Sequence, residues 1–200
     1  MCKSWKKNRK GGSNMRVIAG KARRLLLETP RGTETRPTQD KIKETLFNIL
    51  APDLPGCRFL DLFAGSGGIG IEALSRGAEF ACFADSSRDA LRCIRRNLEW
   101  TGFAEQSAVY GMDYLSALRQ MEYDGRHFDI VFLDPPYHKE LAVQALRFLR
   151  TSSLTDDDTL FVVEEALDAD DTRSAAEAAG YEIFRTKEYK SNQHWFMKRK

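Results

Sequence analysis

Four short apolar segments of this chain each end in an aspartate, and this repeated pattern constrains the fold more than any other feature. The four residues are Asp61, Asp85, Asp113 and Asp134. Such apolar segments are typical of buried parallel strands, and helical patterns lie between them. Alternating strands and helices predict a doubly wound, mostly parallel sheet, in which the carboxyl ends of the strands line a ligand crevice. We therefore predict an α/β fold with an acidic crevice.

The rest of the chain extends this alternation to a predicted sheet of seven strands. A loose apolar alternation over residues 17–27 predicts a small β-hairpin, and an apolar stripe after Pro37 predicts a helix that ends near residue 50. Core strands are predicted at 58–62, 80–84, 108–112, 128–133 and 160–163. Segments 181–189 and 194–198 predict a final hairpin, which adds one antiparallel strand at the edge of the sheet.

A glycine turn follows the first core strand. Gly65, Gly67 and Gly70 match the G-x-G-x-x-G pattern of nicotinamide and flavin enzymes, so that class must be weighed. Asp61 argues against it, because a carboxylate at the strand end would meet a pyrophosphate as a like charge. S-adenosylmethionine carries an ammonium and a sulfonium and has no phosphate. It therefore fits the acidic strand end better.

Asp85 and Asp113 extend the predicted cofactor site. Asp85 lies about twenty residues after Gly65, where an acidic residue takes ribose hydroxyls in nucleotide-binding α/β folds. The Asp113 carboxylate could accept a hydrogen bond from an adenine amino group. Each aspartate alone is better explained as a helix N-cap, because Asp before a helix is an ordinary cap. Four of them at the ends of four successive strands favour a binding site.

The segment Asp134-Pro135-Pro136-Tyr137 directly follows the apolar run 128–133. The Asp134 carboxylate and the Pro135 carbonyl can accept the two hydrogen bonds of a planar amine, and the Tyr137 ring can stack on a base. The two prolines remove two backbone donors and fix φ. A strand-terminating turn is the alternative explanation, because Pro-Pro is common in turns. Beside the glycine turn, the segment predicts a site for a nucleobase amine.

These motifs resemble those of one family. The chain is similar to class I S-adenosylmethionine-dependent methyltransferases, and more narrowly to the RsmD-type guanine-N2 methyltransferases of small-subunit ribosomal RNA. The narrow resemblance runs from residue 15 to the C-terminus and includes the blocks 16–20, 29–32 and 35–50 beside the two motifs above. The segment 189–192 departs from the Tyr-Gly pair that the family often carries there.

The resemblance implies a Rossmann-like fold that transfers a methyl group from S-adenosylmethionine to N2 of a guanine in 16S ribosomal RNA, within an assembled or assembling small subunit. The implied catalytic residues are Asp134, Pro135, Pro136 and Tyr137. The implied cofactor-binding residues are Asp61, Phe63, Gly65, Gly67, Asp85, Ser86, Asp113, Arg36 and Thr38. Three alternatives stay open: a DNA adenine-N6 or cytosine-N4 methyltransferase, a protein-glutamine methyltransferase, and a non-catalytic RNA-binding module.

Positive charge is concentrated near the N-terminus. Residues 1–50 hold thirteen Lys and Arg against four acidic residues, a net charge of +9, so the remainder carries −7 because the whole chain carries +2. This asymmetry predicts a disordered basic arm at 1–14 and an RNA-contacting hairpin and helix at 15–55, ahead of a methyltransferase domain at 56–200. The arm is equally well explained as a solvated tail. Phosphate contacts are predicted for Lys21, Arg23, Arg24, Arg31 and Arg36.

Other classes find less support in the sequence. No apolar run approaches the roughly twenty residues needed to span a bilayer, and the basic N-terminus lacks the apolar core of a signal peptide. We therefore predict a cytoplasmic, monomeric protein with no membrane partner. The four cysteines lack metal-binding spacing, so we predict reduced core thiols and no metal site.

Overall fold

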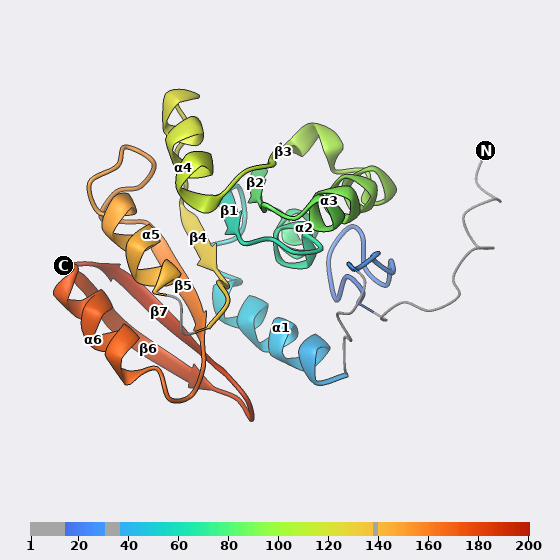
Figure 1. The fold of residues 1–200 in the computed structure, drawn as a ribbon. Helices are drawn as coiled ribbons and strands as arrows, with labels where there is room; N and C mark the ends of the chain where they lie inside the picture. The colour runs from blue at the N-terminus through green and yellow to red at the C-terminus, as the bar shows by residue number, and fades with distance from the viewer. Residues whose placement is uncertain (1–14, 31–36, 138–139) are drawn as a thin grey trace, which may run out of the picture.

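The computed structural model describes residues 15–30, 37–137 and 140–200. Its centre is a seven-stranded sheet with the strand order β3-β2-β1-β4-β5-β7-β6 (Figure 1). The strands are β1 (Arg58–Leu62), β2 (Phe80–Ala84), β3 (Ser107–Tyr110), β4 (Ile130–Leu133), β5 (Leu160–Glu165), β6 (Tyr181–Glu188) and β7 (Gln193–Arg199). Strands β1 to β5 pair in parallel. The predicted doubly wound, mostly parallel sheet is therefore confirmed.

The one antiparallel strand lies in a different place from the prediction. Strand β7 runs antiparallel to both β5 and β6, so it lies inside the sheet and β6 forms the edge. The difference follows from burial. Trp195, Phe196 and Met197 of β7 are all buried, whereas β6 exposes residues such as Phe184 and Arg185 along its length. A strand that is apolar on both faces has to be covered on both faces, and this favours the interior of the sheet over its edge.

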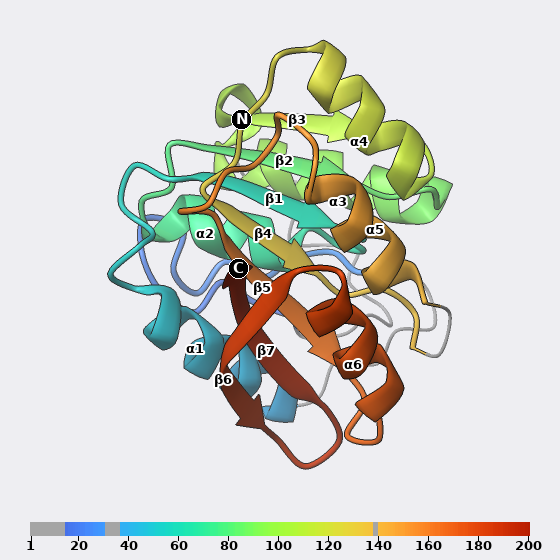
Figure 2. The same ribbon diagram turned by 90° about the vertical axis from the view of Figure 1, so that its left-hand side faces the viewer.

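Helices cover both faces of the sheet (Figure 2). The α-helices are α1 (Pro37–Leu50), α2 (Gly68–Arg76), α3 (Arg88–Thr101), α4 (Tyr114–Tyr123), α5 (Leu141–Leu149) and α6 (Asp170–Ala178), and η2 (Ala104–Gln106) is a short 3-10 turn. Phe59 of β1 belongs to the core formed with α1, α2 and α3. The next residue, Leu60, belongs to the core formed with α4, α5 and α6. This period of two is what a strand buried on both faces requires.

The N-terminal segment forms less of a hairpin than the apolar alternation predicts. Among the described residues its antiparallel pairing is short: Arg16 forms a bridge with Leu26, and the Val17 and Leu27 N–H groups donate to the Leu25 and Met15 carbonyls at 2.9 and 2.8 Å. The backbone N–H groups of Ile18 and Ala19 donate instead to the Glu72 carboxylate of α2, at 2.7 and 3.0 Å. Because these donors are already bound to a helix side chain, they are not available to a partner strand. The predicted β-hairpin at 17–27 is therefore present only as a short antiparallel pair around Arg16 and Leu26.

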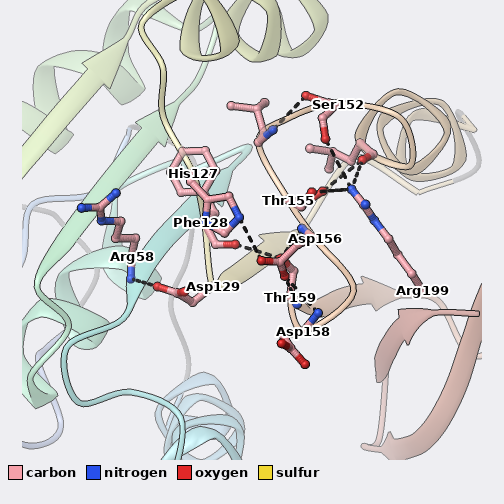
Figure 3. A network of polar contacts seen from close by, with 12 residues as sticks. Arg58, His127, Phe128, Asp129, Ser152, Thr155, Asp156, Asp158, Thr159 and Arg199 are labelled. Carbon is pink, nitrogen blue, oxygen red and sulfur yellow. Dashed lines mark hydrogen bonds and ion pairs between the residues drawn. The ribbon is translucent and has the colours of Figure 1, made fainter.

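A polar network closes the amino edge of the sheet (Figure 3). The Asp129 carboxylate, just before β4, accepts the Arg58 N–H of β1 at 2.6 Å, and the Thr159 hydroxyl donates to the Phe128 carbonyl at 3.0 Å. The Arg199 guanidinium donates to three main-chain carbonyls between the end of α5 and β5, at 2.6, 3.5 and 2.8 Å. These contacts join four strands at one edge. The opposite, carboxyl edge is the one that carries Asp134.

Other predictions are tested in part. Cys57, Cys82 and Cys93 are free and buried, as predicted, and burial raises the pKa of the Cys57 and Cys82 thiols to about 12. Within the described ranges, no helix is both long enough and apolar enough to cross a membrane. Cys2, Arg31, Arg36 and the arm 1–14 lie outside the described residues. The domain division at residue 55 stays a prediction.

Candidate active site

The carboxyl ends of β1, β2 and β4 open into one cavity of about 510 Å³. Eight of the predicted site residues line it: Phe63, Asp85, Ser86, Asp113, Asp134, Pro135, Pro136 and Tyr137. Met112, Tyr114 and Leu141 add apolar surface. The sheet topology thus brings together residues that are up to 74 positions apart in the sequence, from Phe63 to Tyr137.

Asp85 connects the end of β2 to the glycine turn. Its carboxylate accepts the Gly65 N–H at 2.9 Å and the Ser87 N–H at 2.7 Å. Gly65 has φ 55° and Gly67 has φ 76°, which L side chains rarely adopt, so glycine is required at both positions. Asp85 therefore holds the turn in place while it remains part of the cavity wall.

Phe63 leaves β1 in a strained conformation. Its φ of 82° is unusual for a residue with a large side chain, and such strain is often found at functional sites. The Phe63 and Ala64 N–H groups both donate to the Ala84 carbonyl, at 3.1 and 2.9 Å, and these bonds hold the bend. The Phe63 ring lies 5.4 Å from the Tyr114 ring, centroid to centroid. The bend places an aromatic wall beside the acidic residues.

The lining suits a cationic or neutral nucleoside better than a pyrophosphate. Asp85 and Asp113 supply carboxylate acceptors, and the apolar side chains supply stacking surface. Among the described residues of the lining there is no Lys or Arg to neutralise a phosphate. Asp113 also caps α4, since its carboxylate accepts the Ser116 N–H at 3.1 Å, and these bonds lower its pKa. Asp113 can therefore cap α4 and line the cavity at the same time.

The structure does not bring every predicted cofactor residue to the cavity. Asp61 is 2% exposed, and its carboxylate accepts the Gly70 N–H at 2.9 Å, at the start of α2. Burial raises the pKa of Asp61 to about 7. Gly67 lies in the turn before α2 and does not line the cavity. Thr38 belongs to α1, but its side chain and Arg36 lie outside the described residues.

Asp134 stands at the carboxyl end of β4, directly after Leu133. The Asp134 side chain is open to the cavity, yet protein surrounds it on the other sides. This enclosure, and next the carboxylates of Glu164, Asp61 and Glu165, raise the pKa of Asp134 well above its ordinary value. A carboxyl group with such neighbours is a common feature of functional sites.

A second cavity of about 700 Å³ adjoins the first and shares Asp134 and Tyr137 with it. Its other walls come from α1, the end of β5, the β6–β7 turn and the start of β7, and they include Lys43, Glu164 and His194. No motif in the sequence predicted this cavity. Asp134 and Tyr137 therefore have space on two sides, where two different molecules can be held.

Glu164 is the centre of a hydrogen-bond network beside Tyr137. Its carboxylate accepts from the Tyr137 hydroxyl at 3.2 Å, from the Asn192 amide at 2.5 Å and bonds His194 Nε2 at 3.0 Å. The Tyr189 hydroxyl bonds His194 Nδ1 at 3.2 Å. Burial opposes ionisation of Glu164, but the bonds from His194, Asn192 and Tyr137 outweigh it and lower its pKa.

Glu164 could have been found from the sequence, since it follows the apolar run 160–163 as Asp134 follows its own run. The C-terminal hairpin also contributes to the site, through Lys190, Ser191 and Asn192. This is the segment that departs from the family pattern.

Comparisons with known proteins agree with this architecture. The family model "Conserved hypothetical protein 95" matches residues 15–198. "Ribosomal RNA small subunit methyltransferase D" of Haemophilus influenzae is 39% identical over 162 residues, which cover 80% of this chain and 82% of the relative. The Escherichia coli K12 protein of the same name is 36% identical over 163 residues, covering 82% of this chain and 80% of the relative.

Solved structures agree as well. The Escherichia coli structure described as "Putative methyltransferase yhhF" has a TM-score of 0.77 and 31% identity, and covers 92% of this chain and 97% of its own. A ribosomal protein L11 methylase from Lactobacillus delbrueckii, at 16% identity and a TM-score of 0.70 over 90% of this chain and 88% of its own, shares the fold. The fold is thus that of a Rossmann-like class I methyltransferase. Within that class, the chain belongs to the RsmD-type methyltransferase family, as its motifs predict.

Proposed function

We propose that this protein transfers a methyl group from S-adenosylmethionine to the exocyclic N2 of a guanine in small-subunit ribosomal RNA. One observation supports this most strongly: Asp134 and Tyr137 stand in the wall shared by two cavities. A methyl donor in the first cavity and a base in the second would meet at this wall. The names of the relatives support ribosomal RNA as the substrate.

The first cavity is the proposed cofactor site. S-adenosylmethionine supplies an activated methyl group on a sulfonium, which needs no metal or further activation by the protein. The Asp85 carboxylate suits the ribose hydroxyls, and the Asp113 carboxylate suits the adenine amine. Phe63 and Met112 suit the flat purine face. Asp61, which is buried behind the glycine turn, would act on this site through Gly70 and α2.

Asp134 and the backbone of Pro135 are the proposed acceptors of the target amine. The lone pair of an aromatic amine is delocalised into the ring, which makes the nitrogen a poor nucleophile. Hydrogen bonds from its two N–H groups to the Asp134 carboxylate and the Pro135 carbonyl favour a pyramidal nitrogen with a localised lone pair. The Asp134 carboxylate also stabilises the positive charge that develops on nitrogen. The proton leaves after transfer, because a methylated arylammonium is strongly acidic.

Tyr137 is the proposed stacking platform for the base. Its hydroxyl is held by Glu164, so the ring has one fixed orientation beside Asp134. Orientation of this kind supplies much of the rate when the donor is already activated. A guanine inside structured RNA has to leave its stack to reach Asp134. We propose that the substrate is an assembled or assembling small subunit.

Transfer of a tritiated methyl group tests the proposal. The full-length protein is incubated with labelled S-adenosylmethionine and, in parallel, with naked small-subunit RNA, small ribosomal subunits and double-stranded DNA, all from cells that lack the gene. Label in the RNA of either ribosomal sample is the expected result. Label in DNA alone would favour the DNA methyltransferase alternative. No binding of S-adenosylmethionine by calorimetry would favour a non-catalytic RNA-binding module.

A further inference from the structure

A second carboxylate stands beside Asp134 on the next strand. Strands β4 and β5 are parallel, and Leu133 pairs with Val163, so the residues that follow, Asp134 and Glu164, occupy the next position of the same register. Neighbouring strands lie about 4.8 Å apart, and side chains at one register position point to the same face. Both residues line the second cavity. A base whose amine reaches Asp134 therefore presents its adjacent ring atoms to Glu164.

The Glu164 carboxylate has room for one more donor. An ionised carboxylate offers about four acceptor positions, and three are taken by Tyr137, Asn192 and His194. The Glu164 side chain is 20% exposed, in contrast to 1% for its partner His194. Its position is fixed by the three donors, so it remains a negatively charged acceptor at one place in the cavity wall.

Guanine is the base that matches two adjacent acceptors. Beside its exocyclic amine lies a ring N–H, which donates a hydrogen bond. Adenine and cytosine instead carry an acceptor nitrogen beside the amine, whose lone pair would face the carboxylate. Flipped bases are recognised by hydrogen bonds to this Watson–Crick edge. Lys190 lines the same cavity, and its ammonium is a donor of the kind that the guanine carbonyl requires.

We infer that Glu164 is a specificity-determining residue, which selects guanine by accepting a hydrogen bond from the ring N–H next to the target amine. The inference rests on the proposed function. Two neighbouring carboxylates then determine which base is methylated. Asp134 binds the amine, and Glu164 accepts a hydrogen bond only from a ring nitrogen that carries a proton. Specificity then has an attractive part for guanine and a repulsive part against adenine and cytosine.

The test compares guanine with 2-aminopurine at the target position of the RNA substrate. 2-aminopurine has the same amine, but its adjacent ring nitrogen is an acceptor. The wild-type protein should transfer methyl to guanine faster by about a hundredfold or more, because sites built to bind a substrate N–H reject analogues that lack it. Glu164→Gln, whose amide can donate to that acceptor, should lower the ratio of the guanine rate to the 2-aminopurine rate by about tenfold or more.

Tyr189→Phe is the matched control, because it removes a hydrogen bond from the same network and leaves the Glu164 carboxylate intact. Its ratio should equal that of the wild type. Similar wild-type rates on the two bases would overturn the inference. An equal loss of rate on both bases in Glu164→Gln would also overturn it, because such a loss indicates a structural role. 2-aminopurine also lacks the guanine carbonyl, so the change of the ratio in a Glu164 variant is the decisive result; if Glu164→Gln does not fold, Glu164→Asp, which draws the carboxylate back from the cavity, takes its place and should lower the ratio as well. Absence of transfer to any ribosomal guanine would instead contradict the proposed function.

Discussion

The Asp134 carboxylate is the single group on which transfer depends in this account. Asp134→Asn keeps the size of the side chain and removes its charge. We expect kcat to fall about 10²- to 10³-fold, the loss typical of removing one stabilising group from a transition state. Affinity for S-adenosylmethionine should change less than about twofold, because the amine contact is made to the other substrate. Radiolabel transfer measures the first quantity and calorimetry the second.

Asp157→Asn is the control for this variant, since Asp157 is exposed in the loop before β5 at the opposite edge of the sheet. It should alter neither quantity. A loss of cofactor affinity in Asp134→Asn as large as its loss of rate would assign Asp134 to the cofactor site.

The raised pKa of Asp134 predicts that transfer depends on pH. The protein that encloses Asp134 outside the cavity, and next the Glu164 carboxylate, raise its pKa and keep it protonated to a higher pH than an ordinary aspartate. Only the ionised form carries the negative charge that accepts the amine hydrogen bond and stabilises the positive charge developing on nitrogen, so kcat should rise about tenfold per pH unit below this pKa and level off above it. Glu164→Gln removes a neighbouring negative charge, which lowers the pKa of Asp134. Its profile should therefore shift to lower pH, and identical profiles in both proteins would refute the coupling.

The site residues were predictable from the sequence where an acidic residue ends an apolar run, as at Asp85, Asp113 and Asp134. Which of these carboxylates is exposed to the cavity was not predictable from the sequence. Asp61 lies within β1, paired with Phe83 and Phe132, and Leu62 follows it in the strand. Its side chain therefore points under α2. The sequence pattern predicts that a strand forms, but it does not predict which of the last residues of that strand faces the crevice.

At the scale of elements, Asp61 couples the stability of the β1–α2 unit to pH. Its pKa is near the ordinary aspartate value of about 3.9 when unfolded and is raised to about 7 when folded. The folded state thus binds the extra proton between these values, so the free energy of unfolding falls as pH rises from about 4 to about 7. The full shift corresponds to about 4 kcal/mol.

Asp61→Asn should remove this penalty, because the amide oxygen can still accept the Gly70 N–H and carries no charge. We expect the variant to be more stable than the wild type at pH 8 and about equally stable at pH 4, measured by urea unfolding. A wild-type protein whose stability is the same at both values would contradict the buried, protonated state of Asp61.

The elements that were mispredicted lie where tertiary contacts decide the outcome. The segment 17–27 has the alternation of a hairpin, but Glu72 takes two of its N–H groups from another element. The order of β6 and β7 depends on which of two adjacent strands is buried on both faces. Each of the two segments has the pattern of a strand. The pattern therefore predicts that both strands form, but it does not predict their order in the sheet.

At the scale of the whole molecule, the basic N-terminal region predicts salt-dependent RNA binding. Arg23 and Arg24 are exposed on the turn that connects the bridged residues Arg16 and Leu26. Arg23→Gln combined with Arg24→Gln should weaken binding of small-subunit RNA and reduce the slope of log affinity against log salt by about 1 for each lost phosphate contact. Binding of S-adenosylmethionine should not change, because neither residue lines the cavities.

The matched control combines Arg119→Gln with Arg147→Gln. These exposed arginines lie on α4 and α5, which cover the opposite face of the sheet from α1 to α3. Filter binding over a salt series compares the two double variants. Equal slopes in both would mean that the N-terminal turn does not contact RNA.

The global topology was the most predictable level, because alternating strands and helices leave few possible arrangements and parallel crossovers share one hand. The second cavity was the least predictable. Its walls come from α1, β5 and the β6–β7 turn, which are distant in sequence, and no local motif links them.

The most direct test of the central claim is mass spectrometric mapping of methylated nucleosides in small-subunit RNA. RNA is taken from cells that lack the gene and from the same cells supplied with the wild-type protein or with Asp134→Asn. The account predicts that one N2-methylguanosine is missing from the first sample, returns with the wild-type protein and does not return with Asp134→Asn. An unchanged set of N2-methylguanosines in all three samples would contradict it.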